Sequence, residues 1–365
     1  MLAIPRVGLP QSKMPDFSPI DAIIEKAIQG GKCPNADLFV GRGNDVLYQK
    51  FYGKMAIKPE ERPMAPGLVF DLASLTKPMA TATSIMILHE RGKLNVKDPI
   101  AKYMPTFAQN GKEAVTIEQC LLHIAGFVPD NPLSDFADGG NIAIERIKVA
   151  PLKNAPGTTF AYSDVGYIVL GELVRLIDGR TIDTFAQDEI CKPLLMRQTS
   201  YLPTNRASIV PTEARDGVFT PGEVHDPRAH KMGGVAGHAG LFASADDVAK
   251  FCQMILRGGV ARGGARILKT ETVAEMIKPR PAPDDQTLRT YGFDCVSPYD
   301  SPRGKVFAKG KSFGHTGYTG GSIWMDPDSG VYIVLLTSRL HPDGKGDVKQ
   351  LRFDVATAVA EALGL

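Results

Sequence analysis

The chain is organised around one stretch of sequence, which runs Asp71-Leu72-Ala73-Ser74-Leu75-Thr76-Lys77-Pro78-Met79-Ala80. A short apolar run precedes it, and apolar residues at helical spacing follow it to about Arg91, so the pattern predicts a turn into a long helix. Ser74 and Lys77 are three residues apart and would share a face of that helix. A hydroxyl nucleophile, an amine and the unpaired N–H groups of a first helical turn would then lie together. The S-x-x-K pattern is weak by itself, because a chain of this length contains about one by chance.

Composition indicates an ordinary globular protein with a sizeable core. The chain has 365 residues, of which 43% are hydrophobic and 22% charged, and this length suggests one large or two smaller domains. The net charge is +2 and no basic tract is present, so nothing indicates a nucleic-acid partner. The longest apolar stretches are too short to span a bilayer.

Cysteine usage and the first residues bear on the compartment. The five cysteines are scattered, odd in number and form no CxxC pair, so buried free thiols are predicted in place of a disulfide framework. Residues 1–6 lack an apolar core of signal-peptide length. We therefore expect a cytoplasmic protein, with export and removal of a signal before residue 1 as the alternative.

Strand patterns occur at both ends of the chain and helical patterns between them. Terminal helices are predicted at about 16–28 and 348–363, and strands at 36–41, 46–51, 312–315, 322–325 and 331–337. This order predicts an α+β fold in which the first two and last three strands form one antiparallel sheet flanked by the terminal helices. Segments 16–71 and 256–365 would form the sheet domain, and 72–255 a mostly helical domain that carries the Ser74 helix.

Two further stretches have the residue types of a reaction site. Tyr162-Ser163-Asp164 follows a turn and precedes a predicted helix. His315-Thr316-Gly317-Tyr318 lies in a glycine-rich segment beside a predicted strand. Together with Ser74 and Lys77 they place a hydroxyl, an amine, a phenol and an imidazole in three separated segments.

These three stretches resemble the motifs of the serine hydrolases related to class C β-lactamases and penicillin-binding proteins, including family VIII esterases, D-aminopeptidases and muropeptide amidases. Residues 74–77 match the S-x-x-K element, residues 162–164 the Y-x-N element, and residues 315–317 the K-T-G element, which is commonly H-T-G in the non-lactamase members. The resemblance implies a β-lactamase/transpeptidase-like fold with the active site in the cleft between the sheet and the helical region.

The resemblance also implies roles for individual residues. Ser74 would attack a carbonyl carbon and form an acyl-enzyme, and either Lys77 or Tyr162 would take its proton. Burial and the neighbouring phenol would lower the pKa of Lys77, or the phenolate of Tyr162 would be stabilised by Lys77. The catalytic set is completed by His315 and by Tyr318, whose backbone N–H would form the oxyanion hole with that of Ser74.

A second group of residues is expected to line the substrate cleft: Asp164, Thr316, Gly317, His123 and His238. His123 lies at an otherwise apolar helix end, so a core or supporting role is the alternative. Two long loops, 126–138 and 211–240, would set specificity.

Two positions depart from the family motifs. Asp164 stands where the pattern has Asn, and a carboxylate there favours a charged Lys77 and offers no amide donor to a substrate. His315 replaces Lys, so the positive charge that binds a β-lactam carboxylate is at best partial near neutral pH. Both changes predict an esterase or a cell-wall-peptide amidase acting on a small ester, peptide or muropeptide, with weak or absent β-lactamase activity.

Other interpretations are weaker. A D,D-peptidase or β-lactamase and a non-catalytic penicillin-binding-like module remain the alternatives within the resemblance. The α/β-hydrolase class is disfavoured because the chain has no G-x-S-x-G motif. The spacing of His225, His230 and His238 matches no familiar zinc pattern, so we expect no metal and no cofactor.

Overall fold

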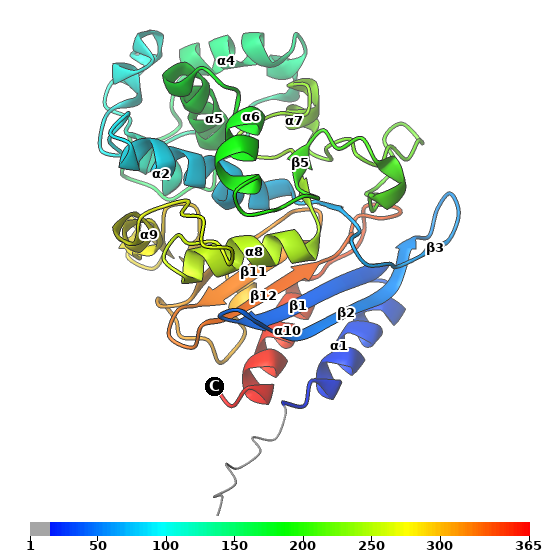
Figure 1. Cartoon of the computed structure of the whole chain (residues 1–365). Helices are drawn as coiled ribbons and strands as arrows, with labels where there is room; N and C mark the ends of the chain where they lie inside the picture. Colours follow the sequence, from blue (N-terminus) through cyan, green and yellow to red (C-terminus); the bar gives the residue numbers. More distant parts are fainter. Residues whose placement is uncertain (1–14) are drawn as a thin grey trace, which may run out of the picture.

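The core of the structure is one antiparallel sheet that joins the two ends of the chain (Figure 1). The computed structural model describes residues 15–365, and within them this sheet has nine strands in the order β3-β2-β1-β12-β11-β10-β9-β8-β7. β1 pairs with both β2 and β12, so a strand from the start of the chain lies beside one from its end. The longer strands are β1 (Asn35–Arg42), β2 (Asp45–Ala56), β10 (Phe313–Thr316), β11 (Ser322–Asp326) and β12 (Val331–Leu336). The shorter ones are β3 (Arg62–Pro63), β7 (Arg280–Pro281), β8 (Leu288–Arg289) and β9 (Asp294–Val296).

Helices cover both faces of this sheet. Side chains of β1 alternate between the faces, so Leu38 and Val40 pack among the terminal helices while Phe39 packs on the other side. Figure 1 shows the two terminal helices on one face and α8 on the other. β12 is buried along its whole length because it lies between these layers. The three helices are α1 (Ser18–Gln29), α10 (Lys349–Ala362) and α8 (Ala245–Leu256).

The helices from the middle of the chain lie beyond α8, away from the terminal helices (Figure 1). The helix α5 (Asp164–Asp178) is at their centre and contacts four of the others. The fold is therefore α+β, as predicted, whereas the division of the chain at residues 72 and 255 stays a prediction. The remaining helices are α2 (Thr83–Glu90), α3 (Ile117–Leu121), α4 (Gly140–Val149), α6 (Ile182–Ala186), α7 (Pro227–Lys231) and α9 (Thr270–Ile277).

A small second sheet fixes the segment that precedes Ser74. It has the strand order β4-β6-β5, with β4 at Phe70–Asp71, β6 at Leu241–Ala243 and β5 at Ser200–Tyr201. The Leu72 N–H continues the pairing by donating to the Leu241 carbonyl oxygen at 3.0 Å. The chain therefore leaves this sheet directly into the Ser74 turn.

The long regular helix predicted after Ser74 is wrong in detail. Ala73–Leu75 forms a 3-10 turn, Lys77–Ala82 is π-helical, and only from Thr83 is the backbone α-helical. Pro78 has no N–H to donate to the Ser74 carbonyl oxygen, so the ordinary i→i−4 ladder is broken there. Ala73 has φ +45°, an uncommon conformation for a residue with a Cβ atom. Ser74 lies in the 3-10 turn, and Lys77 is the first residue of the π-helical turn. Such irregular helical turns are frequent at functional sites.

The structure bears on the cysteines and the helices, and the compartment itself stays a prediction. All five cysteines are buried free thiols, as predicted. Among the residues that the structure describes, every helix is too short or too polar to cross a bilayer. The N-terminal stretch that was considered for a signal peptide lies outside the described residues.

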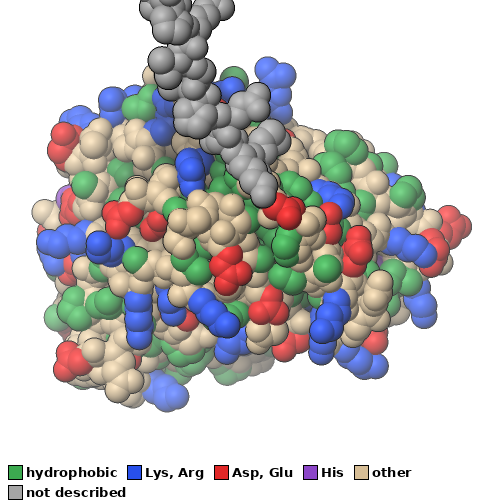
Figure 2. All heavy atoms as spheres, turned by 90° about the horizontal axis from the view of Figure 1, so that it is seen from below, with side chains coloured by type: hydrophobic (Ala, Val, Ile, Leu, Met, Phe, Trp, Pro, Cys, Tyr) green, Lys and Arg blue, Asp and Glu red, His purple; other side chains and the backbone are tan. Residues whose placement is uncertain are grey.

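The surface on the side of the terminal helices carries mixed charge. Figure 2 shows lysine and arginine side chains interspersed with aspartate and glutamate over this face. Interspersed charges of both signs produce no extended field of one sign.

Candidate active site

Ser74 and Lys77 are in direct contact. The Lys77 Nζ atom lies 2.8 Å from Ser74 Oγ, 2.6 Å from Asp164 Oδ1 and 3.1 Å from the His238 carbonyl oxygen. The contacts with Ser74 and His238 are hydrogen bonds, and the contact with the Asp164 carboxylate is an ion pair. The Lys77 side chain is fully buried, so its position is fixed by these contacts and by the surrounding core.

Tyr162 completes the group. It precedes α5 by two residues, and its ring centroid lies 4.9 Å from Lys77 Nζ. The ring stacks on His123 at 4.3 Å and lies 6.0 Å from the His315 ring. Two segments that are far apart in the sequence therefore bring a hydroxyl, an amine and a phenol together, and a third adds the His315 imidazole, as the motifs predicted.

The surroundings of Lys77 and Tyr162 set the charge state of the pair. Burial disfavours its charged form, but the Asp164 carboxylate and Tyr162 outweigh burial and hold the pKa of Lys77 above its ordinary value. Burial also raises the pKa of Tyr162, against the opposing effect of the Lys77 charge. Of the two alternatives, a Lys77 whose pKa is lowered by burial and the phenol is not found, and the charged Lys77 that an Asp164 carboxylate favours is found. At rest Lys77 is an ammonium and Tyr162 a neutral phenol.

This protonation state predicts the pH dependence of activity. The Lys77–Tyr162 pair must lose one proton before it can accept that of Ser74, so kcat/KM should rise with pH from neutral into the alkaline range. Replacing Asp164 by Asn removes the charge that holds the Lys77 proton, so the pKa of Lys77 should fall and the acid limb should move to lower pH. Parallel pH–rate profiles of the wild type and Asp164→Asn measure the shift. Asp138→Asn, which changes an exposed aspartate, is the matched control, and superimposable profiles for all three proteins would refute this account of the base.

β10 supplies one wall of the site. His315 lies on this strand and is buried, and its Nδ1–H donates to the Thr316 carbonyl oxygen at 2.8 Å. Its Nε2 atom has no hydrogen-bond partner among the described residues. Burial, with the nearby charges of Arg289 and Lys77, holds the pKa of His315 well below its ordinary value. A neutral imidazole therefore occupies the position at which the K-T-G motif has a cation.

The turn after β10 packs directly against the Ser74 segment. A Cβ atom on Gly317 would lie 2.5 Å from the Leu72 carbonyl oxygen, so only glycine allows this close approach. The Tyr318 side chain is 63% exposed and stacks on His225 at 5.7 Å. The oxyanion-hole role of the Ser74 and Tyr318 backbone N–H groups stays a prediction.

Two connected cavities meet at Ser74 and Tyr162, and we name them by their charged residues. The acidic chamber, of about 830 Å³, is lined by Asp130, Asp164 and Asp226 together with His225, His238 and several aromatic rings. The arginine chamber, of about 320 Å³, is lined by Arg339 and Arg352, by Asp294 and Asp347, and by His315, Thr316 and Gly317. Tyr299 and Tyr318 also line both chambers.

Two predicted substrate contacts take different positions. His238 lines the acidic chamber, and its Nε2 atom pairs with Asp226 Oδ1 at 2.9 Å. His123 lines neither chamber, because Tyr162 covers it. Its Nδ1 atom accepts the Ser163 N–H at 2.9 Å, so it supports the turn that carries Tyr162. The structure thus favours the supporting role for His123.

The loop histidines do not form a common metal site. His225 pairs with Glu213 at 2.7 Å, whereas His238 pairs with Asp226. Within residues 15–365 the metal-ligand side chains that approach one another closely are Asp164, Asp226 and His238. The Lys77 ammonium already lies against Asp164, so a cation of the protein itself occupies this cluster.

Several residues of the site carry no motif in the sequence. Arg289 and Asp294 form a fully buried ion pair below Tyr162, with the guanidinium 5.9 Å from the Tyr162 ring centroid. Arg352 of α10 donates to the carbonyl oxygens of Gly317 and Gly321, at 2.8 Å each, and so supports the turn after β10. No local pattern could have identified these residues, because each one reaches the site only through the tertiary fold.

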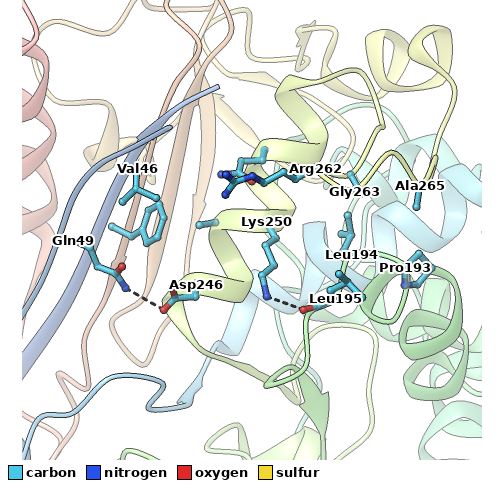
Figure 3. A pocket seen from close by; sticks show the side chains of 14 residues that line it. Val46, Gln49, Pro193, Leu194, Leu195, Asp246, Lys250, Arg262, Gly263 and Ala265 are labelled. Atoms are coloured by element: carbon cyan, nitrogen blue, oxygen red, sulfur yellow. Dashed lines mark hydrogen bonds between the residues drawn. The ribbon is translucent and has the colours of Figure 1, made fainter. Parts of the chain in front are cut away.

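A further cavity lies between the sheet and α8, away from Ser74 (Figure 3). It has a volume of about 610 Å³, and two of its polar side chains bond within the protein. Gln49 donates to Asp246 at 3.1 Å, and Lys250 donates to the Leu195 carbonyl oxygen at 2.7 Å. Its lining has no hydroxyl or thiol nucleophile, so the Ser74 cleft stays the candidate reaction site.

Comparison with known proteins assigns the family. The Beta-lactamase family model matches residues 20–357. The chain is 31% identical to the "Putative D-alanyl-D-alanine carboxypeptidase" of Salmonella agona (strain SL483), over 88% of this chain and 82% of that protein.

Solved structures agree on the fold. A penicillin-binding protein homologue from Caulobacter crescentus superposes with a TM-score of 0.77 at 22% identity, over 95% of this chain and 97% of that one. A family VIII carboxylesterase gives a TM-score of 0.74 at 19% identity, over 95% and 97%. The β-lactamase/transpeptidase-like fold is therefore confirmed. From the family match and the identity to the Salmonella protein, the chain belongs to the beta-lactamase family and is a serine hydrolase.

Proposed function

We propose that the protein hydrolyses a small ester or amide through an acyl-enzyme on Ser74. The observation that carries this proposal is the 2.8 Å contact between Ser74 Oγ and Lys77 Nζ at the junction of the two chambers. A serine hydroxyl is a poor nucleophile until a neighbouring base accepts its proton. After the Lys77–Tyr162 pair has lost one proton, it accepts that of Ser74 as the oxygen attacks the substrate carbonyl carbon. The same pair returns the proton to the leaving group, and water then releases the acyl group.

The arginine chamber supports a substrate that carries a carboxylate. Arg339 and Arg352 line it, together with Asp294 and Asp347, and guanidinium groups bind carboxylates well. The name of the Salmonella relative refers to D-alanyl-D-alanine, which ends in a carboxylate. Cell-wall peptides are therefore the favoured natural substrates, and simple esters are expected to react because they are easier to cleave than amides. The free thiols support a reducing, cytoplasmic compartment, in which a muropeptide fragment would be the substrate.

Penicillins are expected to be poor substrates. The Asp164 side chain cannot donate a hydrogen bond to a substrate carbonyl while it is ionised, and it is bonded to Lys77. His315 is held neutral and therefore offers no full positive charge to the lactam carboxylate. Nitrocefin, which has an activated lactam ring, is the lactam most able to react.

A substrate panel with covalent labelling tests the proposal. We expect turnover of p-nitrophenyl butyrate, slower turnover of a peptide ending in D-alanyl-D-alanine or of a muropeptide, weak turnover of nitrocefin and none of benzylpenicillin. A fluorophosphonate should label the peptide that contains Ser74, as read by mass spectrometry. If the protein is neither labelled nor active on any ester or peptide, it is a non-catalytic module. Benzylpenicillin turnover at the rate of the best ester would make it a β-lactamase.

A further inference from the structure

A buried aspartate lies directly before the Ser74 turn, and the reaction proposed above makes no use of it. Asp71 is the last residue of β4 and is buried. Its Oδ1 atom accepts the Ala73 N–H at 2.8 Å, and its Oδ2 atom accepts the His225 N–H at 2.7 Å. One carboxylate therefore bonds both the backbone just before Ser74 and the backbone of the long loop 211–240.

The first of these bonds acts on a strained residue. Ala73 has φ +45°, and this conformation costs free energy for a residue with a Cβ atom. An aspartate side chain that bonds the N–H two residues further on stabilises a local turn. Ser74 follows at once, and its Oγ atom lies 2.8 Å from Lys77 Nζ. The Asp71 carboxylate therefore offsets strain in the backbone on which this contact depends.

The second bond fixes a residue of the cleft wall. His225 lines the acidic chamber together with Ser74. Its Nε2 atom pairs with Glu213 at 2.7 Å, and its ring stacks on Tyr318. Loops are usually more mobile than the elements they connect. The bond to Asp71 gives the loop 211–240 a fixed point beside the nucleophile.

The backbone of Asp71 contacts a third segment. Its carbonyl oxygen accepts the Thr319 Oγ1–H at 2.7 Å. Thr319 is buried in the turn after β10, and it follows Tyr318, whose N–H is the predicted oxyanion donor. Asp71 is thus the residue at which the Ser74 turn, the loop that carries His225 and the turn after β10 meet.

We propose that Asp71 is a positioning residue, whose carboxylate holds the Ser74 turn in its reactive geometry and fixes the loop 211–240 against that turn. This inference rests on the proposed function, because it assigns the support of the same nucleophile. Asp71 lines neither chamber, so it acts only through the residues that it bonds. A reacting group that is displaced by about 1 Å can lose about 10²-fold in rate, so such support is needed for catalysis.

Two variants of Asp71 separate its two bonds. Asp71→Ala removes both acceptors, so kcat for p-nitrophenyl butyrate and the rate of fluorophosphonate labelling should each fall by about 10²-fold. Asp71→Asn keeps one oxygen for the nearby Ala73 N–H, whereas its amide N–H₂ group would face the His225 N–H. This variant should keep kcat within about fivefold of the wild type and raise KM by about fivefold, because only the loop is released.

Asp247→Ala is the matched control. Asp247 is buried on α8, accepts the Gln198 N–H at 2.7 Å and lines neither chamber. Its loss should lower the thermal stability, as that of Asp71 should, but it should leave kcat and the labelling rate within about twofold. A merely structural aspartate at position 71 would behave in the same way as Asp247.

A glycine at position 73 gives a second test. Glycine adopts a positive φ without the cost that alanine incurs, so the Ser74 turn would depend less on Asp71. Ala73→Gly in the Asp71→Ala background should therefore recover kcat by about fivefold, and the same change in the wild type gives the baseline. Loss of stability alone would not be repaired selectively in this way.

The outcomes that overturn the inference are distinct from those that remove the proposed function. The inference fails if Asp71→Ala affects kcat and labelling no more than Asp247→Ala does, if Asp71→Asn is as slow as Asp71→Ala, or if glycine at position 73 restores nothing. If Asp71→Ala does not fold, Asp71→Asn decides alone, and an unchanged KM overturns the inference. All these results leave the proposed function standing as long as the wild-type Ser74 is labelled. A wild type that is neither labelled nor active on esters would remove the proposed function itself.

Discussion

Replacing Ser74 by alanine is expected to lower kcat for p-nitrophenyl butyrate by about 10⁴-fold or more, since nucleophile and base act as one unit in serine hydrolases. The Ser74 hydroxyl makes the contact with Lys77 on which the proposed acyl-enzyme depends. The change removes one oxygen atom at a partly buried position, so the fold should tolerate it. Steady-state kinetics on the purified variant, together with its thermal unfolding, measure both effects.

Ser84→Ala is the matched control for this variant. Ser84 is a buried serine on α2, in the same continuous helical segment, and its Oγ atom has no hydrogen-bond partner among the described residues. The same chemical change at this position should leave kcat within about twofold, because a change away from the reacting groups does not alter the barrier. A Ser74→Ala variant that kept more than a tenth of the wild-type activity would disprove the acyl-enzyme proposal.

The sequence predicts the elements whose side-chain pattern repeats over several residues. The strands β1, β11 and β12 and the helices α1 and α10 have such patterns, and each one lies close to its predicted range, whereas β2 continues to Ala56, past its predicted end at residue 51. The sheet of β4, β5 and β6 has strands of two or three residues, which are too short to show any periodicity. The break in the helix after Ser74 depends on Pro78, whose effect could have been predicted, and on the support from β6, which could not.

The residues of the site also fall into two groups: those that a sequence motif identifies, and those that only the tertiary fold brings to the site. Ser74, Lys77 and Tyr162 belong to motifs whose residue types and order are enough to bring them together. Arg289 and Arg352 reach the site from β8 and α10, and nothing in their local sequence distinguishes them from surface arginines. The sequence leaves the direction of the Lys77 pKa shift open for a related reason. Its sign depends on whether burial or the carboxylate of Asp164 dominates, and the 2.6 Å distance that decides this is a property of the fold.

Replacing Lys77 by methionine should lower kcat for ester hydrolysis by about 10²- to 10⁴-fold, the usual contribution of general acid–base catalysis. Methionine has a similar length and suits the buried position, but it cannot accept the Ser74 proton. The variant should also be less stable by up to about 3 kcal/mol, because Asp164 loses its counter-charge while mostly buried. Kinetics and urea unfolding measure the two losses separately.

The double variant Lys77→Met/Asp164→Asn separates catalysis from stability. Removing the carboxylate along with its partner leaves no unpaired charge, so most of the lost free energy of unfolding should return. Activity should stay as low as in Lys77→Met alone, because the amine that takes the proton is still absent. If the double variant recovered both stability and activity, Lys77 would act only by neutralising Asp164, and Tyr162 alone would be the base. If Lys77→Met alone kept wild-type kcat, neither the amine nor its ion pair would take part in the reaction.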